Sequence, residues 1–394
     1  MSTIETLPHP KRKVVLISMT LILLITAIIF FLYWWKWGRF DEYTDDAYVA
    51  GNLVYITPQI NGIVTNIYVD DTWYVQEGQV LIELDQTDYQ IALDKSNAHL
   101  GQTIRKVAEL FAEANQKKAQ VQTAKAEFIK DSEDFERRSA LVDSGSVSKE
   151  DFSHATAALT SSYFSLIAAE QEYFSLKVQI EHTTIKTHPL VEESIQEVKK
   201  NWVNLSRCTL KAPKAGLVAQ RKAQVGERVS PSEFILSVVP LDEIWVEANY
   251  KEDQIGSMQI GQKATISTDI YGSHILYEGE VVGIGAGTGS VFSLLPPQNA
   301  TGNWIKIVQR VPIRISLSPS QILDYPLRIG LSTEVHVDIH PLKNPPLSKE
   351  PTSHPLYTTT IFVNEEEGAK ALIDTIFANN LPSFSLEFQE EELP

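Results

Sequence analysis

The sequence predicts an elongated, multidomain molecule of mixed α and β structure, and three observations support this class. An uncharged apolar run near the N-terminus is long enough to form a transmembrane helix, and two β-patterned segments far apart in the chain match one another. Between these segments, residues 86–206 carry the periodicity of a long helical hairpin. Residues 242–340 alternate as in a small antiparallel β-barrel. A chain of 394 residues is long enough for all of these modules.

The apolar run at residues 14–35 reads VVLISMTLILLITAIIFFLYWW. As a helix it spans roughly 33 Å, enough for the hydrocarbon core of a bilayer. The alternative is a cleaved signal peptide, but its apolar stretch is normally shorter and ends in small residues rather than in YWWKWGRF. The charges that flank the run favour a cytoplasmic N-terminus. We therefore expect residues 1–37 to form a cytoplasmic tail and a single-pass anchor.

Composition argues against several functions. The formal net charge of −16 argues against a nucleic-acid partner, because binding phosphates needs a basic face. The single cysteine, Cys208, has no partner for an intramolecular disulfide, so we expect a small buried apolar side chain. His336 and His340 would lie roughly 13 Å apart on a strand, too far to share a metal. No catalytic grouping stands out, so we expect no enzyme activity, no cofactor and no metal. An envelope enzyme or carrier protein is the competing class.

Residues 59–85 (QINGIVTNIYVDDTWYVQEGQVLIELD) and 211–241 match at three positions with constant spacing. These positions are Gly62, Val64 and Val75 in the first segment and Gly216, Val218 and Val229 in the second. The segments resemble the two halves of a carrier-type β-hammerhead, as in biotinyl or lipoyl domains. Both glycines suit a tight turn where a side chain would obstruct the facing strand. We assign residues 38–85, with a lead-in strand, and 207–241 to the halves of one split lipoyl-like domain.

In a carrier domain, a lysine at the tip of the hairpin between the halves holds the cofactor. Here residues 86–206 replace that tip. Lys95 lies in a Leu-Asp-Lys tripeptide like that of a lipoyl lysine, but inside a helical pattern. We therefore expect no attached cofactor.

Residues 86–206 predict a long antiparallel coiled-coil hairpin. In the outward limb, residues 87–142, apolar residues recur every seven positions, at Leu93, Leu100, Val107, Ala114, Val121, Phe128, Phe135 and Val142. An unbroken seam of this kind is typical of a long helix packed on a partner helix. A compact bundle of short helices is the alternative, but it would need turns within this limb.

Gly145 and the serines around it predict the reversal of the chain, and Ser148 reads as the N-cap of the return limb, with Asp151 three residues on. The return limb repeats the seven-residue spacing at Phe152, Leu159, Leu166, Tyr173 and Ile180. Pro189 should then end or kink the helix, because proline lacks the backbone donor.

After the predicted barrel, residues 341–394 turn proline-rich and then acidic. We expect a linker and a loosely ordered tail with a short helix at EEEGAKALIDTIFANN. The glycine-rich run at residues 283–289 is interpreted as a loop, since no helix follows to make a phosphate cradle.

In this order, the modules at residues 14–340 resemble the HlyD superfamily of membrane fusion proteins, the periplasmic adaptors of tripartite exporters. Four strings resemble the EmrA branch: TDDAYVAGN (44–52), IWVEANYKEDQI (244–255), GTGSVFSLLPPQNATGNWIKIVQRVPIRI (287–315) and PLRIGLST (326–333). The resemblance implies a homo-oligomeric adaptor for multidrug efflux, anchored in the inner membrane with its bulk in the periplasm. It would link a major-facilitator drug transporter to a TolC-like outer-membrane channel. An adaptor of an ABC-type (type I) system shares this layout and is the alternative.

The resemblance also implies a docking site at the hairpin tip. The family carries an Arg there, a Leu four residues on and a Ser seven further, and Arg137, Leu141 and Ser148 match this spacing. These residues would contact the channel, although Ser148 could instead act only as a cap. The resemblance does not address the tail after His340.

Overall fold

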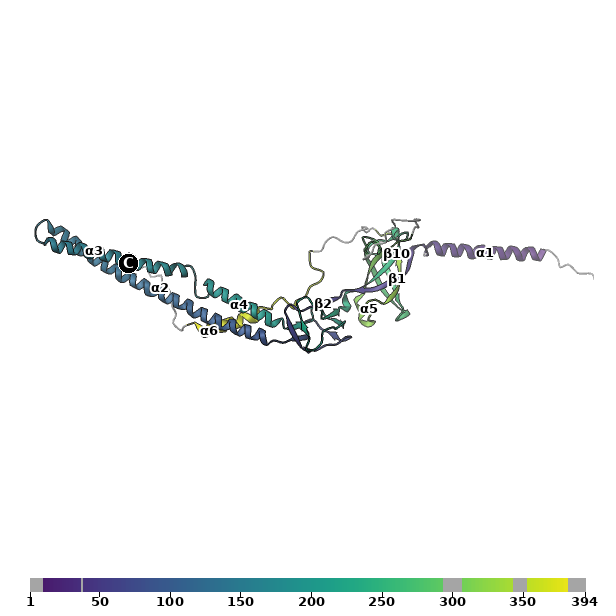
Figure 1. Cartoon of the computed structure of the whole chain (residues 1–394). Coiled ribbons are helices and arrows are strands. Elements are labelled where there is room, and N and C mark those ends of the chain that lie inside the picture. The colour runs from purple at the N-terminus through teal and green to yellow at the C-terminus, as the bar shows by residue number, and fades with distance from the viewer. Residues whose placement is uncertain (1–9, 37, 293–306, 343–352, 382–394) are drawn as a thin grey trace, which may run out of the picture.

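The computed structural model describes residues 10–36, 38–292, 307–342 and 353–381, which form an elongated row of modules (Figure 1). The apolar helix lies at one end, followed by the barrel, a smaller β-rich unit and the helical hairpin (Figure 1). The predicted fold class is confirmed, and the hairpin tip lies at the end of the molecule opposite the apolar helix (Figure 1).

Helix α1 (Pro10–Lys36) contains the predicted span. From Val14 the described side chains of this helix are exposed, and no part of its apolar window is buried inside the protein. The hydroxyls of Ser18 and Thr26 donate to carbonyl oxygens of the preceding turn, Val15 O at 2.9 Å and Ile22 O at 3.0 Å. These polar groups are therefore satisfied within the helix, as a lipid environment requires.

Eight short strands form the lipoyl-like unit. They are β2 (Val54–Ile56), β3 (Gly62–Ile67), β4 (Tyr74–Val75), β5 (Val80–Leu84), β6 (Thr209–Lys211), β7 (Gly216–Ala219), β8 (Arg228–Val229) and β9 (Leu236–Val239). The two four-stranded sheets have the orders β2-β9-β7-β4 and β6-β5-β3-β8, so each sheet mixes strands from both segments. The strands β2 to β5 of the first segment correspond, in order, to β6 to β9 of the second. When each strand is replaced by its counterpart, the order of one sheet becomes the order of the other. The predicted repeat is therefore a structural pseudo-twofold, and neither half completes a sheet alone.

The pairing of matched positions follows the same symmetry. Gly62 pairs with Val229, and Gly216 pairs with Val75. Backbone angles with positive φ also recur at the offset of the repeat, at Thr72 (75°) with Gly226 (87°) and at Gly78 (81°) with Ser232 (68°). The two halves thus share unusual backbone conformations even where their residue types differ.

The prediction that Gly62 and Gly216 lie in turns is wrong, because these residues begin β3 and β7. The predicted obstruction of the facing strand is correct. A Cβ on Gly216 would stand 2.3 Å from the carbonyl oxygen of Val239, and one on Gly62 would stand 3.0 Å from the Leu84 side chain. Because Gly216 faces backbone atoms, which cannot move aside as a side chain can, the need for glycine is stricter at Gly216 than at Gly62.

Three helices make the hairpin: α2 (Thr87–Val142), α3 (Lys149–Ile180) and α4 (Pro189–Ser206). The outward limb is one unbroken helix with the predicted bounds, about 84 Å long at 1.5 Å per residue, and a bundle of short helices is excluded. The return limb is broken, because α3 ends at Ile180 and α4 begins with Pro189 at its first position. The helix is interrupted before Pro189, as expected, but α3 has already ended at Ile180. Pro189 occupies the first position of α4, where its missing N–H leaves no helical hydrogen bond unmade.

Six strands close the barrel in the order β1-β10-β13-β12-β11-β14. Their bounds are β1 (Asp41–Gly51), β10 (Ile244–Lys251), β11 (Lys263–Thr268), β12 (Gly272–Ile284), β13 (Arg310–Leu317) and β14 (Ser332–Asp338), and a short helix, α5 (Pro319–Asp324), follows β13. The strand β1 falls within the segment that we assigned to the lipoyl-like lead-in, so that assignment is corrected. Because β1 pairs with both β10 and β14, it removes two open edges that residues 242–340 alone would leave. Residues 293–306 of the EmrA-like string lie outside the described part.

The tail contains helix α6 (Glu367–Asn380), which confirms the predicted helix. This helix packs on α2 and α4 near the base of the hairpin (Figure 1), and Ala369, Ile373 and Phe377 belong to the same buried cluster as Leu100 and Val198. The expectation of a loosely ordered tail is therefore wrong for this part. Residues 382–394 lie outside the described residues.

Candidate docking site at the hairpin tip

The tip is a short reversal between α2 and α3. The backbone N–H of Gly145 donates to Val142 O at 3.1 Å, and Gly145 has φ +73°. This left-handed conformation is costly for residues with a Cβ, which accounts for glycine at the predicted reversal. The Ser144 hydroxyl donates to Leu141 O at 2.7 Å and so closes the end of α2.

Ser148 is the N-cap of α3. Its Oγ accepts from the Asp151 backbone N–H at 3.0 Å and donates to Asp151 Oδ2 at 2.7 Å. Ser148 is therefore the predicted N-cap. Asp151 accepts from the Ser148 hydroxyl, whereas in a capping box the third residue accepts from the backbone N–H of the N-cap residue. Because both bonds stay within the chain, the capping role has a direct structural basis. A contact between Ser148 and a channel stays a prediction.

Arg137 and Leu141 lie one turn apart near the end of α2, and both are exposed. The Arg137 side chain is 68% accessible, and its Nη2 lies 3.6 Å from Asp134 Oδ1. Leu141 is 44% exposed, so part of its apolar side chain is accessible to a partner. An exposed ion pair of this kind contributes at most about 1 kcal/mol, so the guanidinium can readily exchange it for another acceptor.

Arg138 is a tip residue that the sequence did not single out. Its Nε lies 2.9 Å from Asp134 Oδ2, and its Nη1 donates to the Asp151 carbonyl oxygen at 3.2 Å, across the hairpin. The rings of Phe135 and Phe152 stack just below, with centroids 5.4 Å apart. Neighbouring arginines therefore differ: Arg138 joins the two limbs, while Arg137 faces outward. The spacing of Asp134 and Arg138 could have indicated a helical ion pair.

Other sequence candidates for chemistry lie far from the tip. Lys95 is exposed within α2 and not at a β-hairpin tip. Cys208 is fully buried, as expected, and this burial raises the pKa of its thiol to about 11. His336 Nδ1 bonds Asp41 at 2.9 Å, while His340 contacts Asp338. Among the described residues, no group of three or more His, Cys, Asp or Glu side chains could hold a metal ion.

Comparisons with known proteins agree with this architecture. The family model of the EmrA α-helical hairpin domain matches residues 87–208. The chain is 39% identical over 378 residues to the "Probable multidrug resistance protein EmrK" of Escherichia coli (strain K12), covering 94% of this chain and 97% of that protein. It is 40% identical over 354 residues to the "Multidrug export protein EmrA" of the same organism, covering 90% and 91%.

A solved structure described as the periplasmic adaptor protein EmrA aligns over 76% of this chain and 98% of its own, with 20% identity and a TM-score of 0.37. The identity to EmrK and EmrA extends over nearly the whole of each chain and includes the helical hairpin. This chain therefore belongs to the EmrA-like family of membrane fusion proteins.

Proposed function

We propose that the protein is the periplasmic adaptor of a multidrug efflux system, and that it links an inner-membrane transporter to an outer-membrane channel. The two relatives are named for multidrug export and multidrug resistance, and they match almost the full length. In this proposal α1 anchors the chain in the inner membrane, several copies assemble together, and the protein performs no chemistry of its own.

The observation that supports this role best is the arrangement of the two ends. The apolar helix α1 lies at one end of the molecule and the hairpin tip at the other (Figure 1). The unbroken α2 alone provides about 84 Å of reach from the lipoyl-like unit. An elongated molecule of this length, with a membrane anchor at one end, is suited to connecting two proteins across the periplasm.

We further propose that the partners are a major-facilitator drug transporter and a TolC-like channel. An ABC-type exporter is the alternative partner for the same layout. The two can be separated by purifying the protein from native membranes with its transporter. A co-purified protein with about 14 predicted spans supports the proposal, and an ATPase contradicts it.

Docking is proposed to occur through Arg137, Leu141 and Ser148. The exposed guanidinium of Arg137 can make charge-assisted hydrogen bonds, and the neighbouring Leu141 offers an apolar contact. Ser148 would hold the first turn of α3 beside them through its cap.

The test is the double variant Arg137→Asp with Leu141→Ser. Both side chains are exposed, so expression, membrane insertion and association with the transporter should stay unchanged. Loss of an interface hot spot costs about 2 kcal/mol or more, roughly thirtyfold in affinity, so we expect drug resistance to be lost.

A matched control exists on the same helix. Ile91 is 61% exposed and Lys95 is exposed one turn further on, so Ile91→Ser with Lys95→Asp makes similar changes far from the tip. This control should retain resistance. Full resistance in the Arg137/Leu141 variant, or equal loss in both variants, would contradict the docking assignment.

A further inference from the structure

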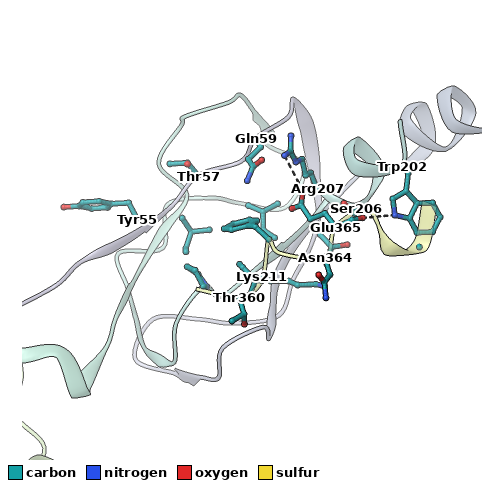
Figure 2. Close-up of a pocket in the computed structure, with 17 residues that line it drawn as sticks. Tyr55, Thr57, Gln59, Trp202, Ser206, Arg207, Lys211, Thr360, Asn364 and Glu365 are labelled. Atoms are coloured by element: carbon teal, nitrogen blue, oxygen red, sulfur yellow. Dashed lines mark hydrogen bonds and ion pairs between the residues drawn. The ribbon is translucent and has the colours of Figure 1, made fainter. Parts of the chain in front are cut away.

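A cavity of about 480 Å³ lies where the C-terminal tail crosses the junction between hairpin and lipoyl-like unit (Figure 2). Three separate parts of the chain line it: the residues around β2, the stretch from the end of α4 to β6, and residues 360–368 of the tail. The cavity therefore exists only while the tail is docked.

Specific contacts hold this tail wall in place. Trp202 Nε1 donates to the Glu365 carbonyl oxygen at 3.1 Å, as Figure 2 shows, and the Thr360 N–H donates to Glu77 Oε1 at 3.3 Å. Gly368 lies so close to Trp202 that an added Cβ would stand 2.1 Å from Cζ2 of the ring. The wall is thus fitted to the end of α4.

The cavity combines apolar surface with an excess of positive charge. Ile56, Leu210 and Phe362 line it, and Phe362 keeps 50% of its surface exposed. Its charged lining residues are Arg207, Lys211 and Glu365, a local net charge of +1 in a chain of −16. An apolar wall beside excess positive charge suits an organic anion rather than a cation.

The two cations have unused bonding capacity. A guanidinium has five N–H donors, yet the Arg207 side chain makes one long hydrogen bond among the described residues, from Nη2 to Glu365 Oε2 at 3.4 Å (Figure 2). Its Nε is buried without a partner in the described part of the chain. No carboxylate of the described residues lies within 4.0 Å of Lys211 Nζ.

We propose that this cavity binds an amphipathic organic anion. The carboxylate or sulfonate would lie against Arg207 and Lys211, and the apolar body would lie against Phe362 and Leu210. The volume is within the range of about 300–1,000 Å³ that is usual for small-molecule sites. The site is formed by the tail and by the junction between hairpin and lipoyl-like unit. Its test is therefore independent of the test of docking at the hairpin tip.

The test is photolabelling of the full chain in native membranes with 4-benzoylbenzoate, a photoreactive aromatic carboxylate. Its neutral isostere, 4-benzoylbenzamide, serves as the comparison probe. Mass spectrometry should find the carboxylate on the peptides that contain Ile56, Leu210 and Phe362, with about tenfold less labelling by the amide, because a charge-assisted bond is lost.

Two substitutions separate binding from folding. Lys211→Gln should reduce labelling of these peptides about tenfold, because it removes a lining charge that makes no hydrogen bond or ion pair with the described part of the tail. Lys214→Gln is the control, since Lys214 pairs with Glu243 at 3.3 Å and does not line the cavity. Arg207→Gln should also lower labelling, because it removes the other cation of the lining. Equal labelling by the two probes, or unchanged labelling of Lys211→Gln by the carboxylate, would overturn the proposal.

Discussion

The two halves of α2 carry the same seven-residue seam but are packed very differently. In the half near the lipoyl-like unit, Leu93, Leu100, Val107 and Ala114 are at most 3% exposed. In the half near the tip, Val121, Phe128, Phe135 and Val142 are only half-buried. The base half packs against α4 and α6, whereas the tip half has α3 as its partner. A heptad seam therefore specifies which face packs, while the number of neighbouring helices sets how deeply it is buried.

The largest expected difference concerns side chains removed from the two halves. Ile104 is 0% exposed, so Ile104→Ala should lower the free energy of unfolding of the hairpin by about 2–5 kcal/mol. Phe128 is half-buried against Tyr163, with ring centroids 5.9 Å apart, so Phe128→Ala should cost about 1–2 kcal/mol. Helical circular dichroism during chemical unfolding measures both. Equal losses would contradict the difference in packing.

The second prediction tests whether α6 accounts for the deep burial of the base. Gly368→Ala places a methyl group against Trp202 and should weaken tail docking by about 1–3 kcal/mol. Limited proteolysis should then cut the tail faster while the hairpin tip is cut at the native rate. Gly256→Ala is the control, because no atom lies within 4 Å of its added Cβ. If both variants resist proteolysis like the native protein, the tight fit between Gly368 and Trp202 is not needed for docking.

The smallest expected effect lies at the tip. Ser148→Ala removes the oxygen that accepts from the Asp151 N–H and should cost about 1 kcal/mol, seen as faster amide exchange in the first turn of α3. Ser148→Asp keeps an N-cap acceptor and should restore the native exchange rate. Unchanged exchange in Ser148→Ala would show that the cap contributes nothing to the stability of the tip.

Local signals in the sequence were sufficient for the hairpin. The seam predicted the bounds of α2, and Gly145, Ser148 and Pro189 predicted the reversal, the cap and the break, because each acts within a few residues of itself. The partner of a strand is not a local property. The alternation in β1 was visible, yet nothing nearby in the sequence indicated that this strand completes the barrel.

The tail shows the same limit. Its helix was predictable from residues 365–380, but docking depends on Gly368 meeting Trp202, which lies far away in the sequence. At the tip, the resemblance indicated Arg137 and Leu141, and their exposure follows only from the packed hairpin. The separate role of Arg138 depends on the position of the Asp151 carbonyl oxygen across the hairpin, which no spacing in the sequence encodes.

Crosslinking from position 141 tests most directly whether the tip contacts an outer-membrane channel, as we propose. The one native thiol, Cys208, is 0% exposed, so a maleimide-benzophenone should react with Leu141→Cys and leave Cys208 unmodified. Irradiation in cells should yield an adduct with a TolC-like channel from position 141, and none from Ile91→Cys near the base. No adduct from position 141, or equal adducts from both positions, would contradict docking through the tip.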